Sequence, residues 1–572
     1  MASRLVLATC GLAEHWLKTL DPVDGHYPLG LAMLHAVADR AGHQVETLYL
    51  VGETEPVSTA KVLDAVRRHD AQVLGFSVIT DNRVATFRAI EAARTRFPDL
   101  RIILGGVHVT VMHEQILKRY PETVAVLGEG EVTLIDLLDA FETGRDLATV
   151  AGIAFMRDGE LVKTACRPLI EDLDSLPPPR HDLFYTPQRT VGQLLTSRGC
   201  PFKCSFCVLD ATSQRKVRAR SPEKVVDEIE LLLTRQPQTE FIHIYDDQFF
   251  ADNKRVIAIC DEIVRRGIQC RFVCQGRVKP ISRELVLALE RANFVTVTLG
   301  LESGSQAILD KCHKKITRQD VERAVALFAD SPIEIAVLLI IGLPGETLAT
   351  VLETAETCRS LQGIKYHAYD SRIQDLFIYP GTEIYEIAKA AGQLDDDFWL
   401  GDGDCPRFHA ELRDPEYTVF REVLLTQLSA SRIFAPGGFV AQRGMIGGII
   451  RFALQSSTMF EGREGVLKLV TTALDTMLND GRLRITAETL PQPLDIFSAH
   501  RKPGGDSEVV LKADRFDALR LVELFPLAYL HGWTAITDQV ERAVSTYLEE
   551  AFASGDGRLN AFHSLPEGRL RF

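Results

Sequence analysis

Three cysteines in the spacing C-x3-C-x2-C constrain this chain more than any other feature. Cys200, Cys204 and Cys207 lie within the stretch Cys-Pro-Phe-Lys-Cys-Ser-Phe-Cys. Thiolate is a soft ligand that selects zinc, copper(I) or iron–sulfur clusters. A structural zinc site closes with four protein ligands, often as two Cys-x2-Cys pairs, and the sequence offers no second pair. Three thiolates can instead hold three irons of a 4Fe–4S cluster and leave the fourth iron open to an outside ligand.

The alternative to a metal site is three cysteines that pack as small apolar side chains. Pro201 and Lys203 are typical of a loop rather than a core strand, which favours the metal site. The chain has 11 cysteines, an odd number, and those outside the motif are scattered. Because this is not the pattern of a disulfide scaffold, we expect a reducing compartment and therefore a cytoplasmic protein.

Length and charge limit the classes of function. The 572 residues predict about three domains. The net charge of −14 argues against a nucleic-acid partner, which needs a basic surface. The longest apolar run, 335–343, contains a glycine and is too short to span a membrane. The first ten residues lack the basic segment and cleavage site of a secretory signal, so we expect them to form the first strand.

Residues 4–142 alternate between strand and helix patterns, which predicts a doubly wound parallel sheet. Strands are expected at 4–9, 43–50, 73–78, 101–104 and 124–127. Ligands of such sheets bind at the carboxyl ends of the strands, and glycines there let the tail of a bulky ligand approach the backbone. Ordinary turn chemistry is the alternative. The small and polar residues at these ends include Ser77, Thr80, Gly105, Gly106, Gly128, Gly130 and Glu131.

A linker is expected at 149–190, after a first domain at 1–148. It contains a hairpin turn at 157–160 and three consecutive prolines that cannot continue a helix.

A second strand–helix series is expected at 191–395. Its strands are near-continuous apolar runs at 193–196, 241–245, 270–274, 295–300, 333–341 and 366–373. Six such units predict a partial parallel barrel, whose site lies at the carboxyl ends of the strands by analogy with the full barrel. The polar and glycine residues that follow successive strands are Asp247, Arg277, Glu302, Ser303 and Gly342.

Two stretches of the sequence resemble known cofactor sites. Ser197-Arg198-Gly199, together with the cysteine motif, resembles the cluster loop of radical S-adenosylmethionine (SAM) enzymes. Residues 28–31, 105–108 and 128–131 resemble the loops of cobalamin-binding domains. Residues 1–395 as a whole resemble the cobalamin-dependent radical SAM enzyme family. The resemblance implies three cofactors, which are a 4Fe–4S cluster on Cys200, Cys204 and Cys207, SAM, and cobalamin, and it implies an external one-electron reductant.

The resemblance also assigns SAM contacts. Asp247 matches the position that binds the SAM amine, and Arg277 matches the arginine that binds the carboxylate, for which a planar guanidinium is suited. Glu302 and Ser303 match polar contacts to SAM. Gly342 would bring the end of the fifth strand close to adenine.

For cobalamin, the resemblance implies contacts from the strand-end residues named above and from Arg83. A residue of the 77–83 loop is expected nearest the lower face of cobalt. The signature Asp-x-His-x-x-Gly, which supplies a histidine to cobalt in other cobalamin proteins, is not matched, because Gly30 comes one residue late after Asp24 and His26. We therefore expect cobalamin without a protein histidine ligand, and we expect His26 in a surface loop.

The activity implied by the resemblance is C-methylation of an unactivated carbon of a small biosynthetic substrate, by way of methylcobalamin and a 5′-deoxyadenosyl radical. A cyclase, an oxidase or a ring-rearranging enzyme that uses the same cofactors without methyl transfer is the first alternative, and a non-catalytic sensor is the second. Tyr366, His367 and Tyr369 of the sixth strand are expected to face substrate, although alternation turns only one face of the strand inward.

Residues 396–572 are expected to form a mainly helical domain. Helices are expected at 414–433, 440–456, 462–479, 515–530 and 534–552, with strands at 482–486 and 508–512. Such a domain either covers the barrel mouth and holds substrate, or only stabilises the chain or a dimer.

Overall fold

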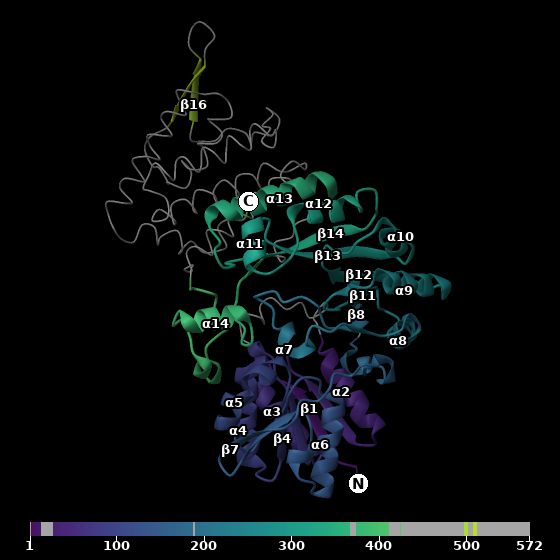
Figure 1. Ribbon diagram of the computed structural model, residues 1–572, viewed down its shortest axis with the longest axis vertical. Helices are drawn as coiled ribbons and strands as arrows, with labels where there is room; N and C mark the ends of the chain where they lie inside the picture. The colour runs from purple at the N-terminus through teal and green to yellow at the C-terminus, as the bar shows by residue number, and fades with distance from the viewer. Residues whose placement is uncertain are drawn as a thin grey trace, which may run out of the picture.

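The computed structural model describes residues 2–12, 27–186, 189–365, 373–410, 424, 497–501 and 507–511. Two α/β units follow one another along the chain. Figure 1 shows the first unit in purple and blue below the second unit in teal, with α7 (Leu209–Ser213) between them. The expected α/β architecture, with a cobalamin-type sheet followed by a partial barrel, is confirmed.

The N-terminal unit is a sheet with helices on both faces. Its parallel strands are β1 (Arg4–Thr9), β2 (Gln44–Tyr49), β3 (Val73–Ser77), β4 (Arg101–Gly105) and β5 (Val124–Val126). The helices between and after them are α2 (Leu29–Arg40), α3 (Glu55–Arg68), α4 (Arg83–Arg96), α5 (Val107–Arg119) and α6 (Glu131–Thr143). The strand order β2-β1-β3-β4-β5 changes direction at β1, and such a switch point is where open α/β sheets bind ligands.

The hairpin expected within the linker lies on the edge of this same sheet. Strands β6 (Ile153–Arg157) and β7 (Glu160–Lys163) extend the sheet beyond β5, and all their pairings are antiparallel. Asp158 and Gly159 between them both have positive φ, as a tight two-residue hairpin turn requires.

The second unit is a six-stranded parallel sheet whose strands lie side by side in chain order. The strands are β8 (Val191–Leu194), β11 (Phe241–Ile244), β12 (Arg271–Gly276), β13 (Phe294–Glu302), β14 (Glu334–Ile341) and β15 (Ile373–Asp375). The helices are α8 (Pro222–Arg235), α9 (Asn253–Arg265), α10 (Arg283–Arg291), α11 (Gln306–Lys311), α12 (Arg318–Ala326) and α13 (Leu348–Lys365). A short antiparallel pair, β9 (Ser197–Arg198) and β10 (Arg218–Ala219), flanks the cysteine loop. Most of the sixth strand expected at 366–373 lies outside the described residues.

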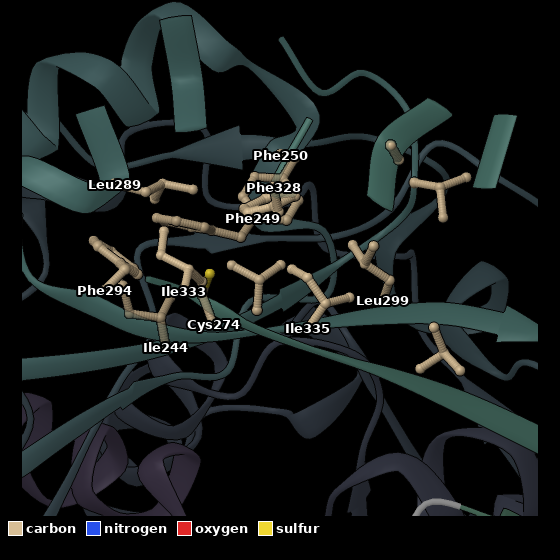
Figure 2. Packing of buried hydrophobic residues seen from close by; sticks show 14 of the residues in the cluster. Ile244, Phe249, Phe250, Cys274, Leu289, Phe294, Leu299, Phe328, Ile333 and Ile335 are labelled. Carbon is tan, nitrogen blue, oxygen red and sulfur yellow. The ribbon is translucent and has the colours of Figure 1, made fainter. Parts of the chain in front are cut away.

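The core of the barrel lies between its strands and the helices outside them. Figure 2 shows Phe249, Phe250 and Phe328 packed above side chains from the strands. Cys274 of β12 lies among these side chains and is fully buried. Because side chains alternate along a strand, the intervening residues of each strand face the inside of the partial barrel.

A hydrogen-bond network centred on the buried His181 and Glu228 joins the two units. His181 lies in the segment that leads to β8, and Tyr27 lies just before α2. Nδ1 of His181 is 2.8 Å from the hydroxyl oxygen of Tyr27. Its Nε2 lies 2.9 Å from Glu228 of α8, and Arg220 donates to the other carboxylate oxygen of Glu228 at 2.6 Å. The backbone N–H of Gln193 in β8 also donates to the Tyr27 hydroxyl. The start of α2 is therefore fixed to the first strand and first helix of the barrel.

After the barrel, α14 (Glu383–Ala390) and the 3-10 helix η7 (Asp396–Leu400) return to the N-terminal unit, where η7 contacts α5. Further on, β16 (Phe497–Arg501) and β17 (Ser507–Leu511) form an antiparallel pair. β17 begins and ends within one residue of the strand expected at 508–512. The strand expected at 482–486 lies outside the described residues. The five expected helices lie outside them too, apart from the single residue Leu424. None of the helices described in the structure is both long enough and apolar enough to cross a membrane.

Candidate functional site

Two aspartates after β11 hold the entry to the cysteine loop. β8 and β11 are adjacent, with Leu194 opposite Ile244, so the residues that follow the two strands meet. Asp246 accepts hydrogen bonds from the Thr196 N–H at 2.6 Å and from the Ser197 hydroxyl at 2.6 Å. Asp247, the residue expected to bind the SAM amine, accepts the Gly199 N–H at 2.7 Å. Burial raises the pKa of both carboxyl groups.

Gly199 makes the turn from β9 into the loop. Its φ of +92° lies in the left-handed region that favours glycine. A Cβ at this position would also collide with the carbonyl oxygen of Lys216. Any other residue here would therefore require the backbone at Gly199 or Lys216 to shift.

None of the three cysteines forms a disulfide with another described cysteine, and each is partly exposed. The loop between them is held by the Ser205 N–H, which donates to the Cys312 carbonyl at 3.1 Å, and by the Ser205 carbonyl, which accepts the Ile384 N–H at 3.2 Å. Within the described residues, no three His, Cys, Asp or Glu side chains are arranged to hold a single metal ion. In a cubane each thiolate binds a different iron, so the sulfurs need not converge on one point. The donor set fits an iron–sulfur cluster.

Arg277, expected to bind the SAM carboxylate, lies beside the cysteine loop. Its Nη1 is 3.5 Å from Sγ of Cys204, and its guanidinium carbon is 3.8 Å from the centre of the Phe202 ring. Nη2 donates to the Lys314 carbonyl. The side chain is thus fixed on several sides, with its charge next to a cysteine of the motif.

Glu302, the last residue of β13, and Ser303, which follows it, are the other expected polar contacts, and both are buried. Glu302 pairs with Lys314 at 2.6 Å, and the Ser303 hydroxyl lies 3.1 Å from that of Thr354. Lys314 is only 5% exposed. It was not predicted, because a lysine in a His-Lys-Lys stretch has the appearance of a solvated surface residue.

Gly342, expected near adenine, turns the chain after β14 with a φ of +93°. Its N–H donates to Oε2 of Glu346 at 2.5 Å. Burial raises the pKa of Glu346 to about 8, although this hydrogen bond acts in the opposite direction. The side chain of Glu346 is a buried acid that the sequence did not single out.

A cavity of about 360 Å³ runs from the N-terminal sheet to the entry of the cysteine loop. Its apolar part is lined by Leu7, Ile103, Val126 and Leu134 among others. A Cβ on Gly75, also in the lining, would lie 2.7 Å from a Leu7 methyl group, so glycine keeps this space open. Of the expected cofactor contacts, the cavity brings together Ser77, Gly105, Gly106, Gly128, Gly130, Glu131 and, from the barrel, Asp247. An apolar cleft with a glycine-lined rim at the strand ends fits part of a corrinoid.

Thr80 and Arg83, also expected to contact cobalamin, do not line this cavity. The hydroxyl oxygen of Thr80 lies 3.2 Å from Nδ1 of His108. Arg83 is buried, and it donates to the Trp399 carbonyl at 3.1 Å and to the Gly403 carbonyl. Arg83 thereby holds the segment after α14 against α4. Its contact with cobalamin stays a prediction, as does that of Thr80.

The remaining candidates lie outside the described residues. They are Tyr366, His367 and Tyr369, expected to face substrate, and His26, expected in a surface loop.

Ion pairs between the two units border the cavity, and the sequence did not predict them. Arg198, two residues before the first cysteine of the motif, donates to Glu129 at 3.0 Å and to Glu131 at 2.6 Å. Arg218 of β10 donates to both carboxylate oxygens of Glu129 at 2.8 Å. The loop after β5 is therefore bonded directly to the strand that leads into the cysteine loop.

Comparison with known families agrees with this arrangement. The model of the radical SAM superfamily matches residues 194–358, and the model of the B12 binding domain matches residues 22–138. An uncharacterised methyltransferase of Pyrococcus horikoshii is 30% identical over 373 residues, which cover 64% of this chain and 79% of that protein. An anaerobic magnesium-protoporphyrin IX monomethyl ester cyclase of Rubrivivax gelatinosus is 32% identical over 354 residues, which cover 59% of this chain but only 63% of the relative.

Among solved structures, the fold resembles that of TsrM, a radical SAM methyltransferase from Kitasatospora setae determined with cobalamin and a [4Fe-4S] cluster bound. The TM-score is 0.59 at 20% identity, and the match covers 83% of this chain and all of that one. The cysteine loop lies within the segment that the radical SAM model matches, and most of the glycines that line the cavity lie within the segment that the B12 binding model matches. The chain belongs to the family of cobalamin-dependent radical SAM enzymes, whose cofactors are a 4Fe–4S cluster, SAM and cobalamin.

Proposed function

We propose that this enzyme methylates an unactivated carbon of a small biosynthetic molecule. The observation that supports the proposal is a cavity whose lining combines the strand ends of the N-terminal sheet with Gly199 and Asp247 of the barrel. Transfer of a methyl group to a carbon radical requires the methyl donor and the radical source to face the same substrate, and adjoining cofactor sites meet that requirement. The name of the Pyrococcus relative points in the same direction.

In this function the chain's own residues place and shield the cofactors. When bound, the cluster and SAM supply a 5′-deoxyadenosyl radical, and cobalamin supplies the methyl group. We propose that Cys200, Cys204 and Cys207 hold the cluster. Asp247 and Arg277 would orient the amine and carboxylate of SAM, each already fixed by hydrogen bonds to the loops around it.

Glu302, Ser303 and Gly342 would complete the SAM site at the ends of β13 and β14. The expected domain limits at 1–148, 149–190, 191–395 and 396–572 are part of this proposal. We also propose that residues 396–572, together with Tyr366, His367 and Tyr369, hold the substrate. An external one-electron reductant would start each turnover.

A second candidate is a cyclase, an oxidase or a ring-rearranging reaction without methyl transfer. It is favoured by the Rubrivivax relative, which is named as a cyclase and is 32% identical. Both candidates use the same cofactor residues, so the coproducts have to separate them.

The test is an anaerobic turnover assay with SAM, a chemical reductant and candidate substrates taken from the biosynthetic context of the gene. Methyl transfer predicts a product that has gained one methyl group, with S-adenosylhomocysteine and 5′-deoxyadenosine formed together. 5′-Deoxyadenosine and a changed product of unmethylated mass, without S-adenosylhomocysteine, would exclude methyl transfer and support the second candidate.

A further inference from the structure

The connection between α11 and α12 contains a buried lysine without an assigned role. Lys314 lies within residues 312–317, and its Nζ is 2.6 Å from Oε1 of Glu302, the last residue of β13. Removing two charges from water costs free energy, and the attraction between them often returns no more than this cost. Stability alone is therefore a weak reason for a buried ion pair at this end of the barrel sheet, and a role in the site has to be considered.

The backbone around this ion pair is strained. Glu302 has a φ of +67°, and His313 and Lys315, which flank Lys314, have φ values of +55° and +54°. Residues other than glycine seldom adopt this region, and when the surrounding structure holds them there, the position is often part of a functional site. The register between β13 and β14 also shifts between Gly300 and Glu302, and such an irregularity turns a side chain in a new direction. The fold therefore holds Glu302 and Lys314 in one specific arrangement.

Gly300 provides the space for the ion pair. A Cβ at this position would lie 2.6 Å from Oε1 of Glu302 and 2.9 Å from Nζ of Lys314. Its neighbours Leu299 and Leu301 belong to the core between the strands and the outer helices. Because side chains alternate along a strand, the two charged groups lie on the opposite face of β13, toward the inside of the partial barrel.

The connection that contains Lys314 also holds two parts of the expected cofactor site through its backbone. The Cys312 carbonyl accepts the N–H of Ser205, in the cysteine loop, at 3.1 Å. The Lys314 carbonyl accepts a hydrogen bond from Nη2 of Arg277, whose Nη1 lies 3.5 Å from Sγ of Cys204. A displacement of this connection would therefore move Arg277 relative to the cysteine motif.

The two oxygens of Glu302 differ in their surroundings. Oε1 is held by Lys314, whereas Oε2 makes no hydrogen bond to a described residue and is not fully buried. An ammonium group fixed on one oxygen sets the direction of the other. We propose that Lys314 is a positioning residue of the SAM site, whose ammonium group orients Glu302 and whose carbonyl orients Arg277. The proposal rests on the SAM contacts proposed for Glu302 and Arg277, and it does not depend on methyl transfer.

The test measures SAM affinity on the full chain, reconstituted anaerobically with its cluster and left unreduced, so that neither substrate nor turnover is needed. Lys314→Met keeps most of the volume of the side chain and removes its charge. It is expected to weaken SAM binding about ten- to hundredfold, as the loss of a charge-assisted hydrogen bond does. Equilibrium dialysis with radiolabelled SAM gives the dissociation constant, and the iron content should equal that of the wild type.

Gly300→Ala tests the arrangement without removing a charge. Gly300 does not have a positive φ, so alanine is allowed there, but its methyl group would displace both charged groups. SAM binding should weaken about three- to tenfold at unchanged iron content. Gly52→Ala is the matched control, because Gly52 also lacks a positive φ and a Cβ there would meet nothing within 4 Å. This control should bind SAM as the wild type does.

A dissociation constant within about twofold of the wild-type value in Lys314→Met, at full iron content, would overturn the proposal. A loss of SAM binding that only matches a loss of iron would overturn it too, since Lys314 would then support the cluster loop and not the SAM site. If far-UV circular dichroism shows that Lys314→Met does not fold, Gly300→Ala decides, and unchanged SAM affinity in that variant overturns the proposal.

Discussion

Replacing any one of Cys200, Cys204 and Cys207 by alanine is expected to abolish both the iron–sulfur cluster and the cleavage of SAM. Each thiolate would hold a separate iron, and no other cysteine is close in sequence to replace it. The variants should be purified and reconstituted without air. Iron and sulfide content, the absorption spectrum and 5′-deoxyadenosine formation should all fall to background.

Cys166→Ala is the matched control. Cys166 is an exposed free cysteine in the segment after β7, and its replacement should leave iron content and SAM cleavage at wild-type levels. A motif variant that keeps its cluster and still produces 5′-deoxyadenosine would show that these cysteines are not the ligands.

Glu228→Ala is expected to destabilise the folded protein by about 3–5 kcal/mol, the usual cost of removing one partner of a buried ion pair. Burial disfavours the ionised form of Glu228, but the hydrogen bonds from His181 and Arg220 outweigh this, and its pKa is lowered. Without the carboxylate, the Arg220 guanidinium, whose side chain is only 14% exposed, keeps a charge whose remaining acceptors are backbone carbonyls. The measurement is the shift of the denaturant midpoint followed by circular dichroism.

Glu230→Ala, on the same helix, is the control for this prediction. Glu230 is about half exposed and pairs with Arg266, which also has two other carboxylate partners. Its loss should cost about 0–1 kcal/mol, as exposed ion pairs do. Equal midpoint shifts for the two variants would mean that the buried network does not join the units as the structure indicates.

The sequence was sufficient to predict most strands because their signals are local. Apolar runs placed β1 at residues 4–9, where it lies. They also placed the starts of nine other strands within two residues of where they lie, which are β2, β3, β4, β5, β8, β11, β12, β13 and β14. The cysteine motif and the paired Asp246 and Asp247 are also local patterns. The position of the 157–160 hairpin on the N-terminal sheet was not foreseen, because turn chemistry specifies a hairpin but not the strand with which it pairs.

The contacts that the sequence did not predict join residues far apart in the chain. Arg198 and Glu129 are separated by 69 positions, and Arg83 and Trp399 by 316. Each of these charged residues has an ordinary surface pattern around it, so no periodicity signals its burial. The same limit applies to the loop 77–83, in which Ser77 lines the cavity while Thr80 and Arg83 pack elsewhere. Tertiary packing, not the loop sequence, selects the side chains that face the ligand.

The central claim is that one chain holds an iron–sulfur cluster and cobalamin at adjoining sites. The most direct measurement is the cofactor content of the wild-type chain after anaerobic reconstitution with iron, sulfide and hydroxocobalamin and removal of unbound material by gel filtration. One cluster and one corrinoid per chain are expected to elute together, and the loaded protein should form 5′-deoxyadenosine from SAM when reduced. A protein that retains only one of the two cofactors, or that retains both and leaves SAM intact, would contradict the claim.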